Sequence, residues 1–599
     1  MKNLLPLLAV TSLAAAGLTA CAATPPARSP DAALNALVEE YFERELELSP
    51  MTATSIGDAR YDDKLDATTS PGFREKLLAA DRAFLDRAHL IDAARLSNAG
   101  RVTYDVFVGE RELTLAGRQF PEELMPLNQM AGLPMDLAMY GSGSGPQPFA
   151  TVRDYERFLK RVREFPRWVD GAIAMMRAGM SRGVTVPRPA MAKVVPQLRE
   201  IVTARVEDNL FWGPIAALPP EFSAADRKRI SAAYRAALTN EVLPAYSRLA
   251  DFIEHDYLPA ARTTVGWSDL PDGPAWYRWR IRGATTLDLA PAQIHELGLA
   301  EVARIRSEML AVKEQVGFKG DLDAFFKFLE EDPQFYFTNE DELLGAYRDV
   351  KRRIDALLPK LFSDFPKADY EIRPVEPFRA ASAAGGSYQA PSGDGKRPGI
   401  FYINTHNLKA QPRFGLETLS LHEAAPGHHF QIAIQQELTD LPRFRRFNGY
   451  VSYAEGWALY AESLGKELGV FTDPYQWYGR LSDEMLRAMR LVVDTGLHSK
   501  GWTREQAIKY MLDNSSMAES DVTAEVERYI VWPGQALGYK VGQLHISALR
   551  EKAEAQLGGA FDVKEFHSQV LRDGALPLGV LSAKIDRWIE SKRKPRAVK

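Results

Sequence analysis

The sequence is poor in cysteine and in long apolar runs, and both shortages restrict what the protein can be. Its single cysteine, Cys21, excludes an intrachain disulfide framework and any zinc or iron–sulfur site built from several cysteines. Beyond the N-terminal segment, no stretch reaches the roughly 18 to 20 apolar residues that a membrane-spanning helix needs. A bound metal would therefore have to be held by histidine and carboxylate.

The chain also lacks a long run of charge of one sign, and it lacks repeats. Its 74 basic and 79 acidic side chains are spread along the sequence and give a formal net charge of -5, which argues against a nucleic-acid-binding protein. No repeat of about 20–50 residues and no low-complexity tract is visible, which disfavours a solenoid. With 599 residues, of which 46% are hydrophobic, the chain is long enough to bury a large core.

The first 20 residues have the pattern of a targeting segment. A short positive start and an apolar stretch from Leu4 to Gly17 lead to small residues before Cys21. The pattern resembles a bacterial lipoprotein signal, which implies removal of residues 1–20, lipidation of Cys21 and a tether over 21–30. The non-acidic Ala22 implies sorting to the outer membrane of the bacterial cell envelope, with the body facing the periplasm and acyl chains as the anchor. The alternative is an ordinary secretory signal with a chance cysteine.

The body, residues 31–599, is predicted to be mainly α-helical. Thr503 and Gln506 form a capping-box pattern that predicts a helix start. The segments expected to be non-helical are 124–150, 184–196 and 372–404, and the last ends in a short β-prone run at 399–404. Apolar residues recur at helical spacing in seven segments: 31–48, 72–95, 152–181, 225–256, 292–315, 340–363 and 545–557.

Three of the ten histidines lie within eight residues, in the segment from His422 to His429. In a zinc-protease helix, two histidines at i and i+4 bind one ion, and the glutamate after the first histidine accepts a proton from water. His422 and Glu423 fit the start of that pattern, but Pro426 occupies the i+4 position. The uninterrupted motif is therefore absent.

A break in the helix would restore the geometry. In an unbroken helix His428 would lie about 240° around the axis from His422, too far round to share a metal. Pro426 and Gly427 interrupt helical hydrogen bonding, so we interpret the pair as an insertion that returns His428 to the i+4 position. His429 is the alternative ligand. The competing interpretation is a helix end with histidines in the core.

A third ligand must come from elsewhere in the chain. Glu455 and Glu462 lie on one face of a predicted helix together with Leu459. The two acids are two turns, about 10 Å, apart, so both cannot bind one ion directly. We assign Glu455 as the ligand and Glu462 as its supporting or salt-bridging neighbour. A surface carboxylate at Glu455 is the competing interpretation.

The histidine segment 422–429 and the segment Glu455–Glu462 resemble the bacterial DUF885 family, which is described as related to gluzincin-type zinc metallopeptidases. The resemblance runs over nearly the whole mature chain. It implies a large, mainly α-helical, two-lobed body with a few short strands beside a central cleft, and a zinc-site portion at about 372–545. Four further segments carry the resemblance: His295–Leu299, Asp394–Gly399, Asp494–His498 and Pro533–Lys540.

The resemblance implies His422, His428 and Glu455 as ligands of one Zn²⁺ per chain, with Glu423 as general base. Zinc is preferred to magnesium or calcium because imidazoles are borderline-soft donors. The expected activity is hydrolysis of a peptide or related amide bond by metal-activated water. The alternative is a peptide-binding or structural lipoprotein that keeps the metal but has no turnover.

Five further residues are candidates for the site or its scaffold. Tyr539, with His498 as runner-up, is expected to donate a hydrogen bond to the developing oxyanion, although a core tyrosine is an equal alternative. Residues 401–404, ending at Asn404, are expected to form an edge strand that binds a peptide backbone. Arg397 is a candidate receptor for a substrate carboxylate. His295 has no nearby histidine partner and is expected to serve packing or local hydrogen bonding.

Overall fold

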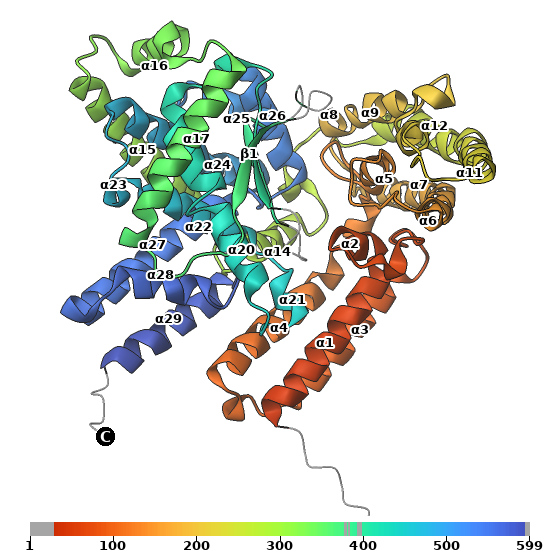
Figure 1. Cartoon of the computed structure of the whole chain (residues 1–599), viewed down its shortest axis with the longest axis horizontal. Coiled ribbons are helices and arrows are strands. Elements are labelled where there is room, and N and C mark those ends of the chain that lie inside the picture. Colours follow the sequence, from red (N-terminus) through yellow and green to blue (C-terminus); the bar gives the residue numbers. More distant parts are fainter. Residues whose placement is uncertain (1–28, 376–379, 381–383, 392–397, 594–599) are drawn as a thin grey trace, which may run out of the picture.

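The computed structural model describes residues 29–375, 380, 384–391 and 398–593. Nearly all regular structure in this part of the chain is helical, and the one sheet described has three short strands, so the prediction of a mainly α fold is confirmed (Figure 1). Within the same residues, no helix combines the length and the apolar character needed to cross a bilayer.

The N-terminal helices form a layer of their own. Tyr41 packs edge-on against Phe84 and Phe107, which joins three of these helices through one aromatic cluster. Short 3₁₀ turns connect them. The helices are α1 (Pro30–Leu48), α2 (Pro50–Ser55), α3 (Phe73–His89) and α4 (Asn98–Ala116).

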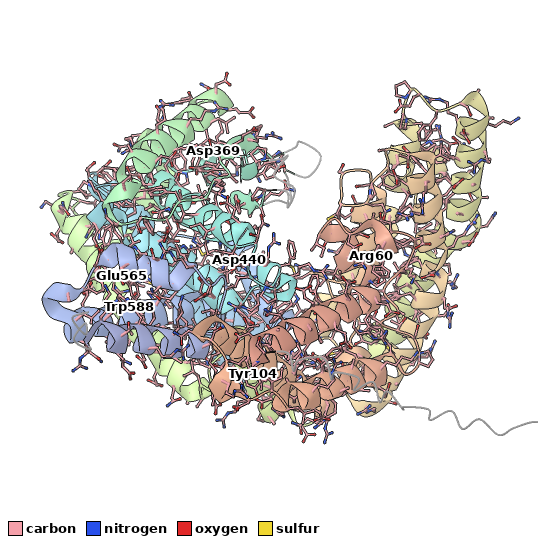
Figure 2. The ribbon with its side chains drawn as sticks, turned by 60° about the horizontal axis from the view of Figure 1, so that its bottom comes forward. Arg60, Tyr104, Asp369, Asp440, Glu565 and Trp588 are labelled. Carbon is pink, nitrogen blue, oxygen red and sulfur yellow. The ribbon has the colours of Figure 1, made fainter. Side chains whose placement is uncertain are left out.

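The next helices stand together as a column at one side of the molecule, and the N-terminal helices that carry Arg60 and Tyr104 lie between this column and the rest (Figure 2). The expectation of a non-helical 124–150 is wrong at α5, because Pro134 lies in the first turn, where its missing N–H costs nothing. Two π-helical turns, Leu238–Val242 and Ile253–Tyr257, interrupt the helix predicted at 225–256. The column contains α5 (Leu133–Gly141), α6 (Val152–Arg163), α7 (Phe165–Arg182), α8 (Arg188–Met191), α9 (Val194–Ile201), α10 (Gly213–Ala216), α11 (Ala224–Ala237), α12 (Leu243–Phe252) and α13 (Leu258–Ala260).

The second half of the chain builds the body that carries the histidine segment. The capping box predicted at Thr503 is confirmed, since Thr503 and Gln506 exchange side-chain and backbone hydrogen bonds at the start of α25. The helices are α14 (Gly273–Thr285), α15 (Pro291–Gln315), α16 (Leu322–Glu331), α17 (Glu340–Leu357), α19 (Leu416–Glu423), α20 (His428–Glu437), α21 (Arg443–Arg446), α22 (Val451–Ser463), α23 (Gly465–Leu468), α24 (Pro474–Ser499), α25 (Arg504–Leu512), α26 (Glu519–Val531), α27 (Leu537–Leu557), α28 (Val563–Leu571) and α29 (Leu578–Arg593).

The sheet has the strand order β1 (Tyr370–Pro374), β3 (Gly399–Ile403), β2 (Gly386–Gln389). β3 runs parallel to β1 and antiparallel to β2. The expectation of an edge strand at 401–404 is therefore wrong: β3 is the central strand and β2 lies at the edge. The reason is visible in its burial, because Ile400, Phe401 and Ile403 are almost fully buried on alternating faces, as in a strand covered on both sides.

Helix α24 is the central support of the body. Most of its last three turns are buried, and it packs along α15, where Gly298 lets the two backbones approach at Leu491 and Val492. A second close pair forms between α22 and α27, where Gly456 and Gly542 face each other. These two contacts fix the relative positions of the helices that surround the histidine segment.

Candidate metal centre

The histidine segment contains two helices with a sharp break between them. Helix α19 ends at Glu423 and α20 begins at His428, and the Ala425–Pro426 peptide bond is cis. A Cβ atom on Gly427 would lie 1.9 Å from the carbonyl oxygen of His422, so only glycine fits there. From α22, the Trp457 Nε1–H donates a hydrogen bond of 2.8 Å to the Pro426 carbonyl. Sterics and this hydrogen bond together hold the break in place.

The break brings two imidazoles together at one carboxylate. The ring centroids of His422 and His428 are 4.8 Å apart at an interplanar angle of 87°. The Oε2 atom of Glu455 lies 3.6 Å from Nε2 of His422 and 3.4 Å from Nε2 of His428. Ligand atoms about 2.0–2.2 Å from a tetrahedral zinc are roughly 3.3–3.6 Å from one another. The distances from Glu455 to the two imidazoles therefore match two edges of a zinc coordination tetrahedron.

Glu423 forms a second grouping with the same two histidines. Ligand atoms of His422, Glu423 and His428 all lie within 4.8 Å of one another. Burial and then the charges of Asp483 and Glu423 raise the pKa of Tyr347, so the Glu423 carboxylate lies within electrostatic range of this buried tyrosine on α17. The structure thus offers one carboxylate, Glu455, between the two imidazoles, and a second, Glu423, beside them.

A further carboxylate fixes the orientation of His422. Glu462 is 1% exposed, and its Oε1 lies 2.7 Å from Nδ1 of His422, on the side of the ring opposite Glu455. With Nδ1–H donating to Glu462, the Nε2 lone pair of His422 faces Glu455 and His428. Glu455 and Glu462, two turns apart on α22, thus face the two ring nitrogens of His422.

The electrostatics of the site favour a cation. Burial lowers the pKa of His422, but Glu455 and Glu462 outweigh it and raise this pKa to about 10. Burial acts to raise the pKa of Glu455, but the two imidazoles hold that pKa well below its usual range. A positive charge between these groups, whether a proton or a metal ion, is therefore strongly stabilised.

His429 faces away from this group. Its Nδ1 lies 2.9 Å from the Tyr388 hydroxyl of β2, and its ring packs against Tyr370 with centroids 4.8 Å apart. Burial lowers the pKa of His429 to about 4. Of the two neighbouring histidines, the structure brings His428 to His422 and uses His429 to join α20 to the sheet.

Tyr539 reaches the same place through the crossing of α22 and α27. A Cβ on Gly542 would lie 1.9 Å from the Ser452 carbonyl oxygen, so this glycine allows the two backbones to touch. Tyr539 is one turn before Gly542, and Glu455 directly precedes Gly456. Burial and then the Glu455 carboxylate raise the pKa of Tyr539, so its hydroxyl keeps its proton at neutral pH and can donate a hydrogen bond.

Other predicted site residues lie elsewhere. His498 is fully buried; its Nδ1 accepts from the Trp267 backbone N–H at 3.2 Å, and its Nε2 lies 3.0 Å from the Tyr529 carbonyl. Both ring nitrogens are occupied, which corrects its assignment as the runner-up oxyanion donor. Asn404 supports a loop, donating to the Ala380 carbonyl at 2.8 Å and accepting from the His406 N–H. Arg397 and Cys21 lie outside the described residues.

Three of the remaining segments of the sequence pattern, His295–Leu299, Asp494–His498 and Pro533–Lys540, join helices of the body to one another; most of the fourth lies outside the described residues. His295 is buried where α15 packs along α24, and its Nδ1 lies 2.8 Å from the Thr495 hydroxyl, so of the two expected roles the structure confirms packing, with a hydrogen bond to a distant segment. Asp494 accepts hydrogen bonds from the Tyr277 hydroxyl at 2.5 Å and the Gly534 N–H at 3.0 Å. Burial raises the pKa of Asp494 to about 7. These hydrogen bonds join α14, α15 and the segment that contains Gly534 to α24.

The structure also reveals charged residues that sequence reasoning missed. Asp483, Arg487 and Arg490 follow one another at i, i+4 and i+7 on α24, and Arg528 joins them from α26. That spacing shows that the first three share a helix face. It does not show that the face is buried beside Tyr539, which depends on the packing of α24 against α26 and α27.

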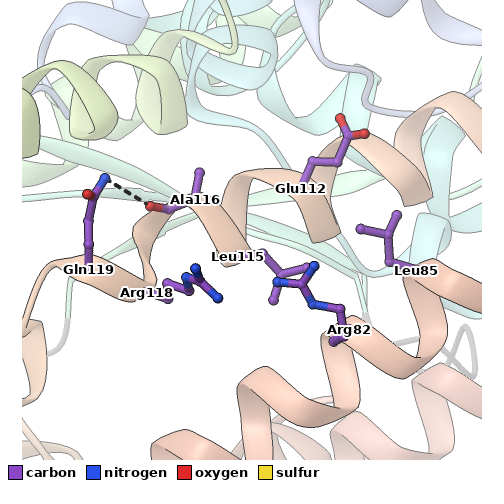
Figure 3. Close-up of a pocket in the computed structure, with 7 residues that line it drawn as sticks. All are labelled: Arg82, Leu85, Glu112, Leu115, Ala116, Arg118 and Gln119. Carbon is purple, nitrogen blue, oxygen red and sulfur yellow. Dashed lines mark hydrogen bonds between the residues drawn. The ribbon is translucent and has the colours of Figure 1, made fainter.

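A pocket of about 510 Å³ between α3 and α4 contains none of the side chains described above (Figure 3). Its charged residues are Arg82, Glu112 and Arg118, and the only hydrogen bond drawn there joins Gln119 to the Ala116 carbonyl at 3.4 Å. It therefore adds nothing to the metal centre.

Comparisons with known proteins agree with the fold. A family model described as "Bacterial protein of unknown function (DUF885)" matches residues 50–585. The crystal structure of "the putative lipoprotein from Colwellia psychrerythraea" is 31% identical, with a TM-score of 0.85 over 94% of this chain and 100% of that one. "A putative lipoprotein of unknown function from Shewanella oneidensis" shares the fold at 18% identity, with a TM-score of 0.74 over 93% of this chain and 99% of that one. No curated protein matches the sequence.

Proposed function

The chain belongs to the DUF885 family of bacterial proteins, and we propose that it is a zinc-dependent hydrolase of peptide or related amide bonds. The family description assigns no function, so the proposal rests on the metal centre. One observation carries it: Glu455 Oε2 lies 3.4 and 3.6 Å from the Nε2 atoms of two imidazoles, with Glu423 directly beside them.

The donor set fits zinc. His422, His428 and Glu455 would hold the ion, and three protein ligands are the usual number for a catalytic zinc site that keeps one position open. Magnesium and calcium favour shells made entirely of oxygen, whereas two of these three donors are imidazole nitrogens. A bound zinc supplies Lewis-acid activation of water and of a substrate carbonyl.

Residues of this chain supply the proton transfers. Glu423 accepts one proton from the attacking water as its oxygen bonds to the carbonyl carbon, and it passes that proton to the amide nitrogen as the C–N bond breaks. The products are a carboxylic acid and an amine. Tyr539, which keeps its own proton, donates a hydrogen bond to the carbonyl oxygen as negative charge develops there. Glu462 keeps His422 in the tautomer that presents Nε2.

The experiment is metal analysis followed by cleavage of a peptide library. We expect about one zinc per chain, as a single ligand set holds a single ion. Cleavage should stop when the zinc is removed by a chelator and return when zinc is added back. Glu423→Gln should retain zinc and lose cleavage, by about 10²–10⁴-fold for a general base. Full activity in Glu423→Gln would refute the assigned base. Zinc-loaded wild type that cuts nothing would favour a non-catalytic peptide-binding or structural lipoprotein.

We also propose that the protein is a cell-envelope lipoprotein anchored through Cys21 and facing the periplasm from the outer membrane. The N-terminal pattern supports this location, and two proteins of similar structure carry the name putative lipoprotein. Metabolic labelling with palmitate should mark the wild type but not Cys21→Ser. Equal labelling of the two, or no labelling of either, would refute the anchor.

A further inference from the structure

Three arginines gather around Tyr539, next to the metal centre. The Arg490 guanidinium lies 4.4 Å from the centroid of the Tyr539 ring, and the Arg528 guanidinium is close enough to act to lower the pKa of the Tyr539 hydroxyl, against the larger effect of burial. Arg487 comes from the turn of α24 before Arg490 and lies within electrostatic range of both Tyr539 and Glu462. Tyr539 lies one turn before Gly542, which contacts Gly456 next to Glu455, so the arginine cluster (Arg487, Arg490 and Arg528) surrounds a residue that neighbours a ligand of the proposed zinc.

The arginine cluster carries more positive charge than its own carboxylates balance. Arg487 pairs with Asp483 at 3.0 Å, while Arg490 and Arg528 share the single carboxylate of Glu525 at 3.0 and 3.3 Å. Three guanidinium groups thus face two carboxylates, because Glu462 is bound to His422 and Asp494, which also lies within electrostatic range of Arg528, accepts from Tyr277 and Gly534. One positive charge is left without a dedicated partner.

Unused hydrogen-bond donors accompany that charge. Among the described residues, the Nε of Arg487, the Nη1 of Arg490 and the Nε of Arg528 are buried and have no hydrogen-bond partner. The Arg490 side chain is only 7% exposed, so water does not freely replace a partner there. Leaving a buried donor unpaired is costly, and a charged one more so. The excess charge and the unused donors both call for an anionic ligand that accepts several hydrogen bonds.

We propose that the arginine cluster receives the free α-carboxylate of a peptide, so that the enzyme releases residues from the C-terminal end of its substrates. The inference rests on the proposed hydrolase function. A terminal carboxylate lies one residue, about 3.8 Å between Cα atoms, beyond the last peptide carbonyl. Tyr539, around which the arginine cluster gathers, lies one turn before the point where α27 crosses α22 beside Glu455, so the cluster is a near neighbour of the proposed zinc ligand. Guanidinium groups suit the carboxylate because they bind its two oxygens in a bidentate manner.

The same helix offers a matched control. Arg480 is also buried, with 6% of its side chain exposed, and it also pairs with a glutamate, Glu484, at 2.6 Å. It lies ten residues before Arg490, about 15 Å along the helix. Arg490→Lys and Arg480→Lys therefore make the same chemical change in similar surroundings, and only the first touches the arginine cluster.

The test measures which peptides the protein retains. Zinc-loaded Glu423→Gln protein is immobilised and offered an equimolar mixture of N-acetylated tetrapeptides with free C-terminal carboxylates and the same sequences as C-terminal carboxamides. Mass spectrometry then identifies and quantifies the retained peptides. We expect the free acids to be retained about tenfold or more over the amides, because charged hydrogen bonds are involved. Arg490→Lys should move this ratio toward one, and Arg480→Lys should leave it unchanged.

Equal retention of acids and amides, or retention of neither, would overturn the inference. Its failure can be told apart from failure of the hydrolase proposal by cleavage of the two libraries with the wild-type enzyme. Cleavage of the carboxamides as fast as the acids would leave the hydrolase standing and remove the carboxylate site. Selective retention of the acids without any cleavage by the wild type would support the carboxylate site and refute the hydrolase proposal.

Discussion

The Glu462 carboxylate offers the sharpest test of how the protein tunes its metal centre. Glu462 is 1% exposed and binds Nδ1 of His422 at 2.7 Å. Glu462→Gln keeps the size of the side chain and an oxygen that accepts the Nδ1 proton, so it removes little except the negative charge. Changes of this kind behind a metal-binding histidine cost about 10–100-fold in metal affinity, or roughly 1.4–2.7 kcal/mol. Because the hydrogen bond survives, we expect the lower end, about tenfold.

The assay is competition for zinc with a chromophoric chelator, repeated at several chelator concentrations to give the apparent Kd. Glu467→Gln is the control, because this glutamate lies just beyond the same helix, is 43% exposed and pairs with Arg550 instead of a histidine. It should bind zinc as the wild type does. Circular dichroism must show that both variants are folded. An unchanged zinc Kd in folded Glu462→Gln would refute the reasoning that this charge supports the metal through His422.

Three further predictions test the site and its scaffold. Gly427→Ala should weaken zinc binding at least tenfold and lower stability by about 1–3 kcal/mol, because its Cβ would meet the His422 carbonyl. Gly449→Ala is the control, because Gly449 has open space around it. Zinc titration and thermal unfolding should show that this variant keeps the zinc affinity and the stability of the wild type. Tyr539→Phe should lower kcat by about 10²–10³ and leave zinc content unchanged; a normal kcat would exclude its hydroxyl from the reaction. The pKa of Asp494 in the folded protein is raised to about 7, whereas an aspartate in the unfolded chain loses its proton above about pH 4. The free energy of unfolding should therefore fall as the pH rises from about 4 to 7, by up to about 4 kcal/mol, and then level off. Asp494→Asn should lack this decline in denaturant midpoints between pH 4 and 8, and an equal decline in both proteins would contradict the assignment.

Local signals in the sequence were enough for the centre of the site. Pro426 and Gly427 cannot continue a helix, so the position of the break between α19 and α20 follows from residue chemistry alone. The pair Glu455 and Glu462 follows from helical spacing, although the sequence left open whether His428 or His429 faces His422. That choice depends on Tyr388 and Tyr370, which hold His429 against the sheet and lie 41 and 59 residues away in the chain.

What the sequence concealed depends on long-range packing. From the sequence alone, His498 was a candidate catalytic residue. In the structure its Nδ1 accepts a hydrogen bond from the backbone N–H of Trp267, 231 residues earlier in the chain. Residues 399–403 appear as a β-prone run, but only pairing with strands on both sides shows that the run is central. Arg487 and Arg490 have the spacing of a solvated helix face, and the approach of α26 and α27 turns that face into the interior beside Tyr539.

Locating the metal directly tests the central claim more closely than any assay of activity. Crystals of the purified protein, measured on both sides of the zinc absorption edge, should show one anomalous peak per chain. We expect this peak at about 2.0–2.2 Å from Nε2 of His422, Nε2 of His428 and a carboxylate oxygen of Glu455. A zinc-loaded protein whose peak lies on other residues, or purified protein that binds no zinc at all, would contradict it.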